Sequence, residues 1–394
     1  MPRMATIICG DGMRSWYRDV LVEDGELFCG PNEANDPPRT MSRPTGEYDA
    51  AAYVKSLPAP WNNPSLVFIF YDTGGNSSAR NLAGLKCPKV LLAGDTHHIC
   101  HPGHRPLGDL IDYCRSEIFD LVLLDYNRQH GHFFLEAGLN AAWLPCFSLT
   151  PFEHPCDTPK KFDVTFIGGL GCHPYRWHVL QSLTSAGISV GYATATQEHT
   201  AEIQSASKIN LNISLNGDFN LRNLEVLAAG GLLMTDRLGA ESGQSILLED
   251  RHHCVMFDSP AECAELLRYY LARPEEAGAI ARAGKAHYLH YHSPAIKRRQ
   301  LFDLLDHHIP AGFDLRDDRR WRLFPDAWED LDRRIRAYED LQEIHRQKCK
   351  PFDFEFSEGM KLFAADASDL PRLTPVGAGA NALDSTRLSL SADT

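Results

Sequence analysis

One acidic residue stands in an otherwise apolar helical segment. In NLRNLEVLAAGGLLMTDR, residues 220–237, Glu225 lies at the edge of a leucine-rich face when the segment is drawn at 3.6 residues per turn. A carboxylate in such surroundings is costly to desolvate unless another group pairs with it. The two hydroxyls of a ribose are one such partner, and Ala228 and Ala229 leave room for the sugar to approach. A salt bridge to Arg222, three residues earlier, is the alternative.

A glycine-rich turn upstream suits an anion. The stretch DVTFIGGLGCHPYRWHVL predicts a strand, a turn with Gly168 and Gly169, and a helix that begins near Pro174. Free backbone N–H groups at the start of that helix, with Arg176 close by, are suited to a diphosphate. A plain strand-to-helix turn is the alternative. Together with Glu225 in the same region, the turn predicts a nucleotide-sugar site.

A second set of polar residues follows an apolar run in the first part of the chain. The stretch LLAGDTHHICHPGH places Asp95, His97 and His98 at the carboxyl end of a predicted strand, where ligands of α/β proteins bind. Either histidine can bond sugar hydroxyls or stabilise developing charge, and Asp95 can orient an imidazole ring. Loop histidines that only cap backbone groups are the alternative. Arg14, in CGDGMR, is a candidate acceptor or phosphate contact, and equally a surface charge.

Two further patterns resemble metal sites. Cys100, His101 and His104 follow the histidine pair, but the group lacks the spaced ligand pairs of a zinc site. Asp330 and Asp332 have the D-x-D spacing of metal-dependent transferases, but they fall on the charged outer face of a predicted helix. We therefore expect no metal site, and a solvated face at the aspartate pair.

Short apolar runs that end near Gly, Asp or Asn predict parallel strands, the elements that position these residues. The first part holds ATIICG, SLVFIFYDTGG, KVLLAGD, FDLVLLDYN and AAWLPCF. After a proline-rich linker the pattern restarts with FDVTFIGGL, ISVGYAT, INLNIS, LLMTD and HHCVMFD. We predict an α/β protein with two Rossmann-like domains facing a cleft, an N-terminal acceptor domain over 1–150 and a nucleotide-sugar-binding domain over 160–308.

The remainder of the chain has a helical pattern and then a polar tail. The stretch AWEDLDRRIRAYEDLQEIHRQK repeats apolar residues at spacings of three and four, which predicts an amphipathic helix. We assign residues 309–370 to a helical C-terminal extension, and expect the C-terminal helices to pack across the domains. Residues 371–394 are small and polar, so we expect them to be disordered.

Composition narrows the class of protein. The chain has 394 residues, of which 43% are hydrophobic, and its 11 cysteines have no framework spacing. Its apolar runs are shorter than the roughly 18 residues that span a bilayer, and its start does not resemble a signal peptide. We therefore expect a cytoplasmic protein without a membrane span. The net charge of −13 disfavours nucleic acid as a partner without excluding it.

The second predicted domain resembles the glycosyltransferases of the two-domain GT-B fold, and within them the spore-maturation-protein (CgeB-like) group. The resemblance rests on four segments in the family's order: FDVTFIGGL with Arg176, INLNIS, NLRNLEVLAAGGLLMTD, and LLRYYLARPEEAGAIARAGKAHYLHYHS. In the first domain, GDTHH and FDLVLLDYNRQHGHFFLEAGLNAAWLPCF also resemble segments of that group.

The resemblance implies roles for several residues. Glu225 is expected to bind the donor ribose and Arg176 the diphosphate. Beside the phosphates we expect Asn220, Arg222 and Asn223. One departure concerns the sugar: many retaining members carry an acidic residue eight positions before the ribose-binding glutamate, where this chain has Gly217. The resemblance therefore does not indicate which residues contact the hydroxyls of the transferred sugar.

We predict a glycosyltransferase of the hexosyltransferase class that moves a sugar from a nucleoside diphosphate sugar to an unidentified acceptor. If retaining, as the resemblance suggests, it needs no metal and no enzymic base, and Arg176, backbone donors and Lys208 stabilise the leaving diphosphate. The donor is a substrate, and no cofactor is expected. A non-catalytic nucleotide-sugar-binding module and a nucleotide-sugar epimerase on the same fold are the alternatives. The base, sugar, acceptor and oligomeric state are not given by the sequence.

Overall fold

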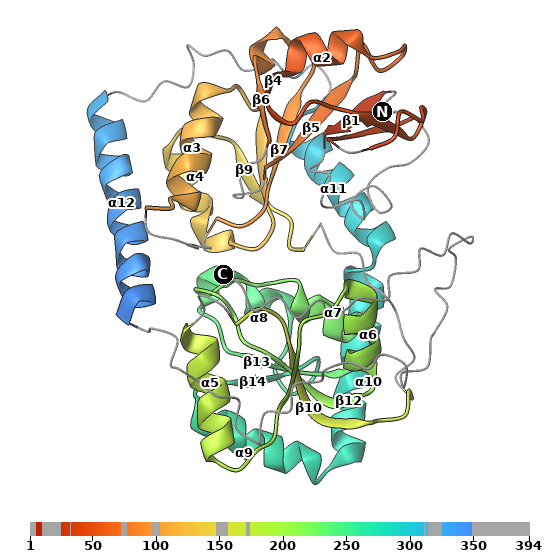
Figure 1. Ribbon diagram of the computed structural model, residues 1–394, viewed down its shortest axis with the longest axis vertical. Coiled ribbons are helices and arrows are strands. Elements are labelled where there is room, and N and C mark those ends of the chain that lie inside the picture. Colours follow the sequence, from red (N-terminus) through yellow and green to blue (C-terminus); the bar gives the residue numbers. More distant parts are fainter. Residues whose placement is uncertain are drawn as a thin grey trace. The chain divides into compact units, whose positions relative to one another are not determined.

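The computed structural model describes residues 5–9, 25–31, 33–71, 77–96, 99, 103–146, 157–170, 174–310, 313 and 325–348 (Figure 1). Contacts divide the chain into two units. Unit 1 comprises Met1–Thr150, Asn216–Phe219 and Pro294–His345, and unit 2 comprises Pro151–Leu215, Asn220–Ser293 and Arg346–Thr394. The contacts thus group the segment after Pro294 with unit 1, whereas the sequence analysis assigned residues up to 308 to the second domain. The expected disordered tail, 371–394, lies outside the described residues.

Unit 1 contains a seven-stranded, wholly parallel sheet. Its order is β3-β2-β1-β5-β7-β8-β9, so the chain winds outward in one direction from β1 and then in the other from β5. This is the doubly wound arrangement of a Rossmann-like domain. The strands are β1 (Thr6–Cys9), β2 (Leu27–Gly30), β3 (Thr40–Ser42), β5 (Leu66–Tyr71), β7 (Lys89–Ala93), β8 (Leu121–Leu124) and β9 (Ala141–Trp143). A separate parallel pair joins β4 (Gly46–Asp49) to β6 (Ser77–Arg80).

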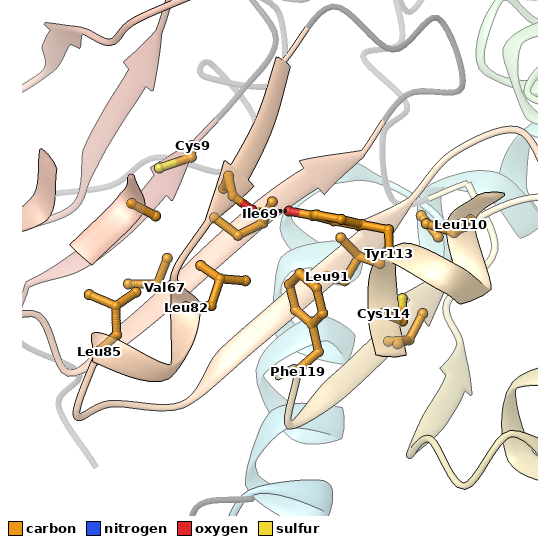
Figure 2. Packing of buried hydrophobic residues seen from close by; sticks show 14 of the residues in the cluster. Cys9, Val67, Ile69, Leu82, Leu85, Leu91, Leu110, Tyr113, Cys114 and Phe119 are labelled. Atoms are coloured by element: carbon orange, nitrogen blue, oxygen red, sulfur yellow. Dashed lines mark hydrogen bonds between the residues drawn. The ribbon is translucent and has the colours of Figure 1, made fainter. Parts of the chain in front are cut away.

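Helices cover both faces of this sheet, because successive strand residues point to opposite faces. Val67, Ile69 and Leu91 belong to one core cluster, which Figure 2 shows packed against Leu110 and other side chains. The helices of that face are α2 (Ala50–Ser56), α3 (Pro106–Ser116), α4 (Gly131–Glu136) and α12 (Pro325–Lys348). The opposite cluster includes residues of α11 (Pro294–His308). Short 3-10 turns occur at η1 (Leu82–Gly84) and η2 (Arg128–His130).

Unit 2 contains a five-stranded parallel sheet of order β11-β10-β12-β13-β14. Its winding reverses between β10 and β12, and doubly wound sheets bind ligands outside the carboxyl ends of the strands at such a point. The strands are β10 (Phe162–Ile167), β11 (Gly191–Ala193), β12 (Ser207–Asn212), β13 (Leu232–Asp236) and β14 (Val255–Phe257). The helices are α5 (Pro174–Ser185), α6 (Gln197–Ser205), α7 (Arg222–Ala228), α8 (Gln244–Leu247), α9 (Pro260–Leu271) and α10 (Pro274–Tyr291), with η3 at Ala240–Ser242.

The short helix α7, which carries Glu225, is held by close packing against α10. At Gly284 of α10 an added Cβ would lie 2.7 Å from the Leu227 side chain and 2.4 Å from the His253 carbonyl oxygen. Only glycine allows this approach, because real Cβ atoms do not come so near other atoms. Lys285 of α10 also donates to the Ala228 carbonyl at 3.1 Å. The apolar face seen in the sequence is therefore the buried face of α7.

Two expectations from the sequence, on membrane spans and on cysteines, can be compared with the described residues. Within them, no helix is long and apolar enough to cross a membrane. Their cysteines are free thiols and are buried, namely Cys9, Cys29, Cys87, Cys114, Cys146, Cys254 and Cys263.

Candidate functional site

The glycine-rich turn follows β10 at the switch point of unit 2. Gly168 has a φ of 148°, and an added Cβ there would lie 2.0 Å from Nη2 of Arg222. Both observations require glycine, because other residues rarely adopt this backbone conformation and the guanidinium leaves no space for a side chain. At Gly169 an added Cβ would meet only open space. The turn therefore allows Arg222 to lie directly against its backbone.

Arg222 ties the first turn of α7 to the carboxyl end of β12. Its Nη1 donates to Oδ1 of Asn212 at 2.9 Å, and its guanidinium carbon lies 5.0 Å from the centre of the Phe166 ring. Nδ2 of Asn212 in turn donates to Oδ1 of Asn223 at 3.2 Å and to the Thr235 hydroxyl at 3.1 Å. Since Asn212 and Asn223 are fully buried, these bonds also satisfy polar groups that water does not reach.

Arg176 is buried, with only 5% of its surface exposed, and bonds to the main chain on two sides. Its Nε donates to the Ile213 carbonyl and its Nη1 to the Gly169 carbonyl, both at 2.9 Å. Its guanidinium carbon also lies 5.6 Å from the centre of the Phe166 ring, so two guanidinium groups share one ring. The first effect of Arg176 is therefore to join the glycine-rich turn to the end of β12, and the second is to add positive charge beside Arg222.

Glu225 is half-buried, and its burial raises the pKa of its carboxyl above the ordinary value while the Arg222 charge opposes that rise. The salt bridge between these two residues, the alternative from the sequence, is not among the ion pairs that join described residues. The backbone carbonyl of Asn220, another predicted site residue, accepts two hydrogen bonds from Asn223. One comes from the backbone N–H at 3.2 Å and the other from the side-chain Nδ2 at 3.1 Å. The structure thus brings Gly168, Gly169, Arg176, Asn220, Arg222, Asn223 and Glu225 to one region of unit 2.

Lys208 does not join this group. It is the second residue of β12 and bonds to Asp163, the second residue of β10, at 2.6 Å between Nζ and Oδ1. Both lie toward the amino ends of strands whose carboxyl ends carry the glycine-rich turn and Asn212. The prediction that Lys208 stabilises a leaving diphosphate is therefore not supported, because Lys208 lies near the amino end of β12 and the glycine-rich turn lies at the opposite end of the sheet.

Asp236, the last residue of β13, is not among the site residues predicted from the sequence. Its buried carboxylate accepts from the backbone N–H of Ser214 at 2.9 Å and from the Ser214 hydroxyl. Gln244 adds a second brace, because its Nε2 donates to the Asp236 carbonyl and its Oε1 accepts from the Leu238 N–H, each at 2.9 Å. Asp236 thereby fixes the segment after β12. The available signal was an aspartate closing the apolar run LLMTD.

In unit 1, Asp95 lies two residues beyond β7 and is partly buried. The candidates His97, His98 and Arg14 lie outside the described residues. So do Cys100 and His101. The described ranges contain no cluster of three or more His, Cys, Asp or Glu side chains arranged to hold a metal ion.

The D-x-D pair on α12 is occupied by arginines. Asp330 pairs with Arg333 and Arg334. Asp332 pairs with Arg336 at 2.6 Å and also with Arg105, just before α3, at 3.2 Å. The predicted solvated face is thus correct for Asp330 but incomplete for Asp332, whose side chain is only 24% exposed because it also contacts the start of α3.

Comparisons with known proteins agree with this geometry. Residues 156–303 match a family model described as glycosyl transferase-like. No curated protein sequence matches the chain at a significant level.

Several solved structures share its fold at low sequence identity. HepE of Anabaena, solved in complex with UDP, is 12% identical, with coverage of 77% of this chain and 100% of its own and a TM-score of 0.50. A glycosyltransferase from Rickettsia africae is 9% identical, with coverage of 79% and 100% and a TM-score of 0.54. Sucrose-phosphate synthase from Thermosynechococcus elongatus is 12% identical, with coverage of 77% and 99% and a TM-score of 0.51. The chain therefore has the GT-B glycosyltransferase fold, and its residues 156–303 are similar to a glycosyl transferase-like family.

Proposed function

We propose that this protein is a hexosyltransferase that uses a nucleoside diphosphate sugar as donor, with a retaining and metal-independent reaction. The observation that carries the proposal is the grouping at the switch point of unit 2, where two guanidinium groups, a glycine turn and a half-buried carboxylate meet. The similarity of residues 156–303 to glycosyl transferases supports it. So does the fold shared with HepE, whose structures contain UDP and UDP-glucose. We extend the proposal to the CgeB-like group and to a cytoplasmic location.

The donor diphosphate is assigned to the glycine-rich turn. Arg176 and Arg222 place two positive charges beside the same aromatic ring, and like charges held this close favour an anion between or beside them. Gly169 lets a ligand approach the backbone, because an added Cβ there would point into open space. Nε and Nη1 of Arg176 bond to carbonyls and Nη1 of Arg222 bonds to Asn212, so both guanidinium groups are assigned to the diphosphate.

The ribose is assigned to Glu225. Burial makes its charged form costly, and hydrogen bonds donated by two sugar hydroxyls reduce that cost. Asn220 and Asn223 hold the backbone at the start of α7, one turn before the glutamate. This order along the chain lets one short helix serve the phosphates at its beginning and the ribose at its centre.

In the proposed reaction the bond between the anomeric carbon and the diphosphate oxygen breaks, and the electron pair stays on the diphosphate. The arginine pair stabilises that developing charge. The acceptor hydroxyl bonds to the anomeric carbon and passes its proton to the departing diphosphate, so that no metal ion is needed. Asp95, with His97 and His98, is assigned to the chemistry of the sugar or acceptor.

A thermal-shift panel of UDP, GDP, ADP and dTDP tests the donor assignment first. A ligand present at 100 times its dissociation constant adds about 2.7 kcal/mol to the free energy of unfolding, which is readily measured. The matching nucleotide sugar is then incubated with the protein, and release of nucleoside diphosphate and of free sugar is followed. Release of the diphosphate, accelerated by an acceptor, is the expected result.

Other outcomes would replace the proposal. Binding without any turnover would identify a non-catalytic module, and an altered sugar formed without acceptor would identify an epimerase. Absence of a stability change with all four nucleotides would contradict the donor site itself.

A further inference from the structure

A continuous set of hydrogen bonds joins α12 to the segment after β7. Nε2 of Gln342 bonds to the Tyr338 hydroxyl, which lies 2.7 Å from Nε2 of His130. Nδ1 of His130 lies 2.7 Å from the hydroxyl of Thr96, which donates to Oδ1 of Asn127 at 3.3 Å. His130, Thr96 and Asn127 are each 1% exposed. The bonds among these three residues are therefore shielded from water and reinforce one another, whereas the two bonds of Tyr338 are partly buried.

The polar set has the His130 ring at its centre. Nε2 of Gln342 donates to the Tyr338 oxygen. The His130 ring lies between two hydroxyls, with Nε2 toward Tyr338 and Nδ1 toward Thr96. The tautomer of His130 decides which partner donates in each of these two bonds. The ring also packs against Tyr338, with centroids 5.2 Å apart, which limits its rotation.

The next residue of α12 holds the start of α3. Oε1 of Glu339 accepts from the backbone N–H groups of Leu107 and Gly108, at 3.1 and 3.0 Å, and its Oε2 accepts from Nε of Arg105 at 3.0 Å. The residue before α3 supplies no side-chain cap of its own, so Glu339 satisfies donors that would otherwise lack partners. Figure 1 shows α12 running beside α3 and α4 within unit 1.

Tyr338 and Glu339, consecutive residues of α12, thus form hydrogen bonds to the segments that follow β7 in the sequence. Tyr338 acts through His130 on Thr96, the neighbour of Asp95, and Glu339 acts on the first turn of the next helix. The Tyr338 ring also packs against the core cluster that contains Leu331 and Ile335, so its hydroxyl joins the docked face of α12 to the polar set.

We propose that α12 is a positioning element for Asp95, with Tyr338 and His130 as its positioning residues. The inference rests on the proposed function for its effect on turnover, but its effect on local order in unit 1 does not. A group that must meet a reacting atom loses rate steeply when its orientation becomes loose. The hydrogen-bonded set holds Thr96 in one position, and Asp95 is thereby held as well.

The test compares two substitutions on α12. Tyr338→Phe removes one hydroxyl and keeps the ring that packs on His130 and Phe133. Ile335→Val is the matched control, because it weakens the docking of the same helix through a fully buried side chain without touching the polar set. For each variant we would measure the melting temperature, nucleoside diphosphate affinity, kcat, donor KM, and hydrogen exchange of the backbone amides of residues 94–96.

Tyr338→Phe is expected to lower kcat by about 10- to 100-fold, with donor KM and nucleotide affinity unchanged, and to accelerate exchange at 94–96. Ile335→Val is expected to lower the melting temperature while both kcat and this exchange stay at the wild-type values. Equal exchange in Tyr338→Phe and wild type would overturn the inference. So would a kcat loss that tracks the melting temperature in both variants.

Failure of the proposed function gives a different pattern. If wild type neither binds nor turns over a nucleotide sugar, the exchange comparison still decides whether α12 orders the residues beside Asp95.

Discussion

The polar groups near the carboxyl ends of the two sheets are held in different ways. In unit 2, Arg222 and Asn212 bond across ten residues of sequence, and Asn212 and Asn223 across eleven. In unit 1, the bond from His130 to Tyr338 joins residues 208 apart, and that from Leu107 to Glu339 joins residues 232 apart. The proposed nucleotide-binding region of unit 2 is thus built largely from neighbouring segments, whereas the region in unit 1 depends on a helix near the end of the chain.

This difference suggests a division of tasks. Unit 2 carries clustered positive charge and a half-buried carboxylate, which suit binding. Unit 1 carries a shielded set of hydrogen bonds beside Asp95, which suits orientation. If the division holds, substitutions in unit 2 should change donor affinity, and substitutions in unit 1 should change turnover.

The largest expected effect is on turnover, from unit 1. Asp95→Asn should lower kcat by about 10² to 10⁴, the usual contribution of a positioned acid, base or charge-stabilising group. His97→Ala or His98→Ala should do the same at the productive histidine. Affinity for the nucleoside diphosphate, measured by calorimetry, should stay constant in each variant. Wild-type turnover in all three variants would remove unit 1 residues from the chemistry, and a parallel loss of nucleotide affinity would end the division of tasks.

A smaller effect is expected on affinity, from unit 2. Glu225→Gln should weaken nucleoside diphosphate binding by about 10- to 100-fold, because hydrogen bonds to a charged acceptor contribute roughly 1.5–3 kcal/mol. Stability should change little or rise, since the raised pKa of Glu225 shows that burial disfavours its charge. A 2′-deoxy nucleotide gives the control: it should bind wild type less well than the ribonucleotide but should bind the variant almost equally. A large loss of stability with unchanged affinity would indicate a structural role instead.

A third effect concerns stability in acid. His253, before β14, and His287 of α10 stack with ring centroids 4.0 Å apart. Burial and the neighbouring histidines lower the pKa of His253 to about 4, and burial lowers that of His287. Because these folded-state pKa values lie below the ordinary 6.5, their contribution to stability is complete above pH 6.5 and is lost as the pH falls toward about 4.

Melting temperatures measured across that pH range should therefore fall in wild type and fall less steeply in His253→Asn. The asparagine amide can replace the ring nitrogen that accepts from the Glu249 N–H. Identical pH dependence in the two proteins would show that another group controls the loss.

The smallest expected effect follows from removal of metal ions. Turnover in excess EDTA should equal turnover in buffer, because the arginine pair of unit 2 is assigned the charge stabilisation that a divalent ion gives in other transferases. Loss of activity that Mg²⁺ or Mn²⁺ restores would show that the arginines are insufficient and would require metal ligands outside the described residues.

The sequence was informative where pattern and contact are local. Apolar runs ending in Gly, Asp or Asn predicted parallel strands in two domains, and such sheets are present because strand hydrophobicity and turn residues are encoded within a few positions. The same locality placed Gly168, Arg176 and Glu225 in one predicted domain, and all three lie in unit 2. Whether they bind a nucleotide is still a prediction.

It was less informative where position depends on register or on distant segments. Lys208 belongs to β12, a strand whose carboxyl end lies beside the glycine-rich turn. The lysine itself is near the amino end of that strand, and only the register of β10 against β12 shows this. The role of Asp332 at α3, and those of Tyr338 and Glu339, depend on partners more than 200 residues away. Amphipathic periodicity predicts that such a helix packs, but it does not say which polar residues meet which partners.

The most direct measurement is a hydrogen-exchange comparison of the full chain with and without the nucleoside diphosphate that stabilises it. The account predicts slower exchange in residues 168–170, 212–215 and 220–225, around the glycine-rich turn and the start of α7, with no change in residues 89–96 of unit 1. Slower exchange confined to unit 1, or to the histidine pair of unit 2, with none at the glycine-rich turn, would contradict the assignment of the donor site.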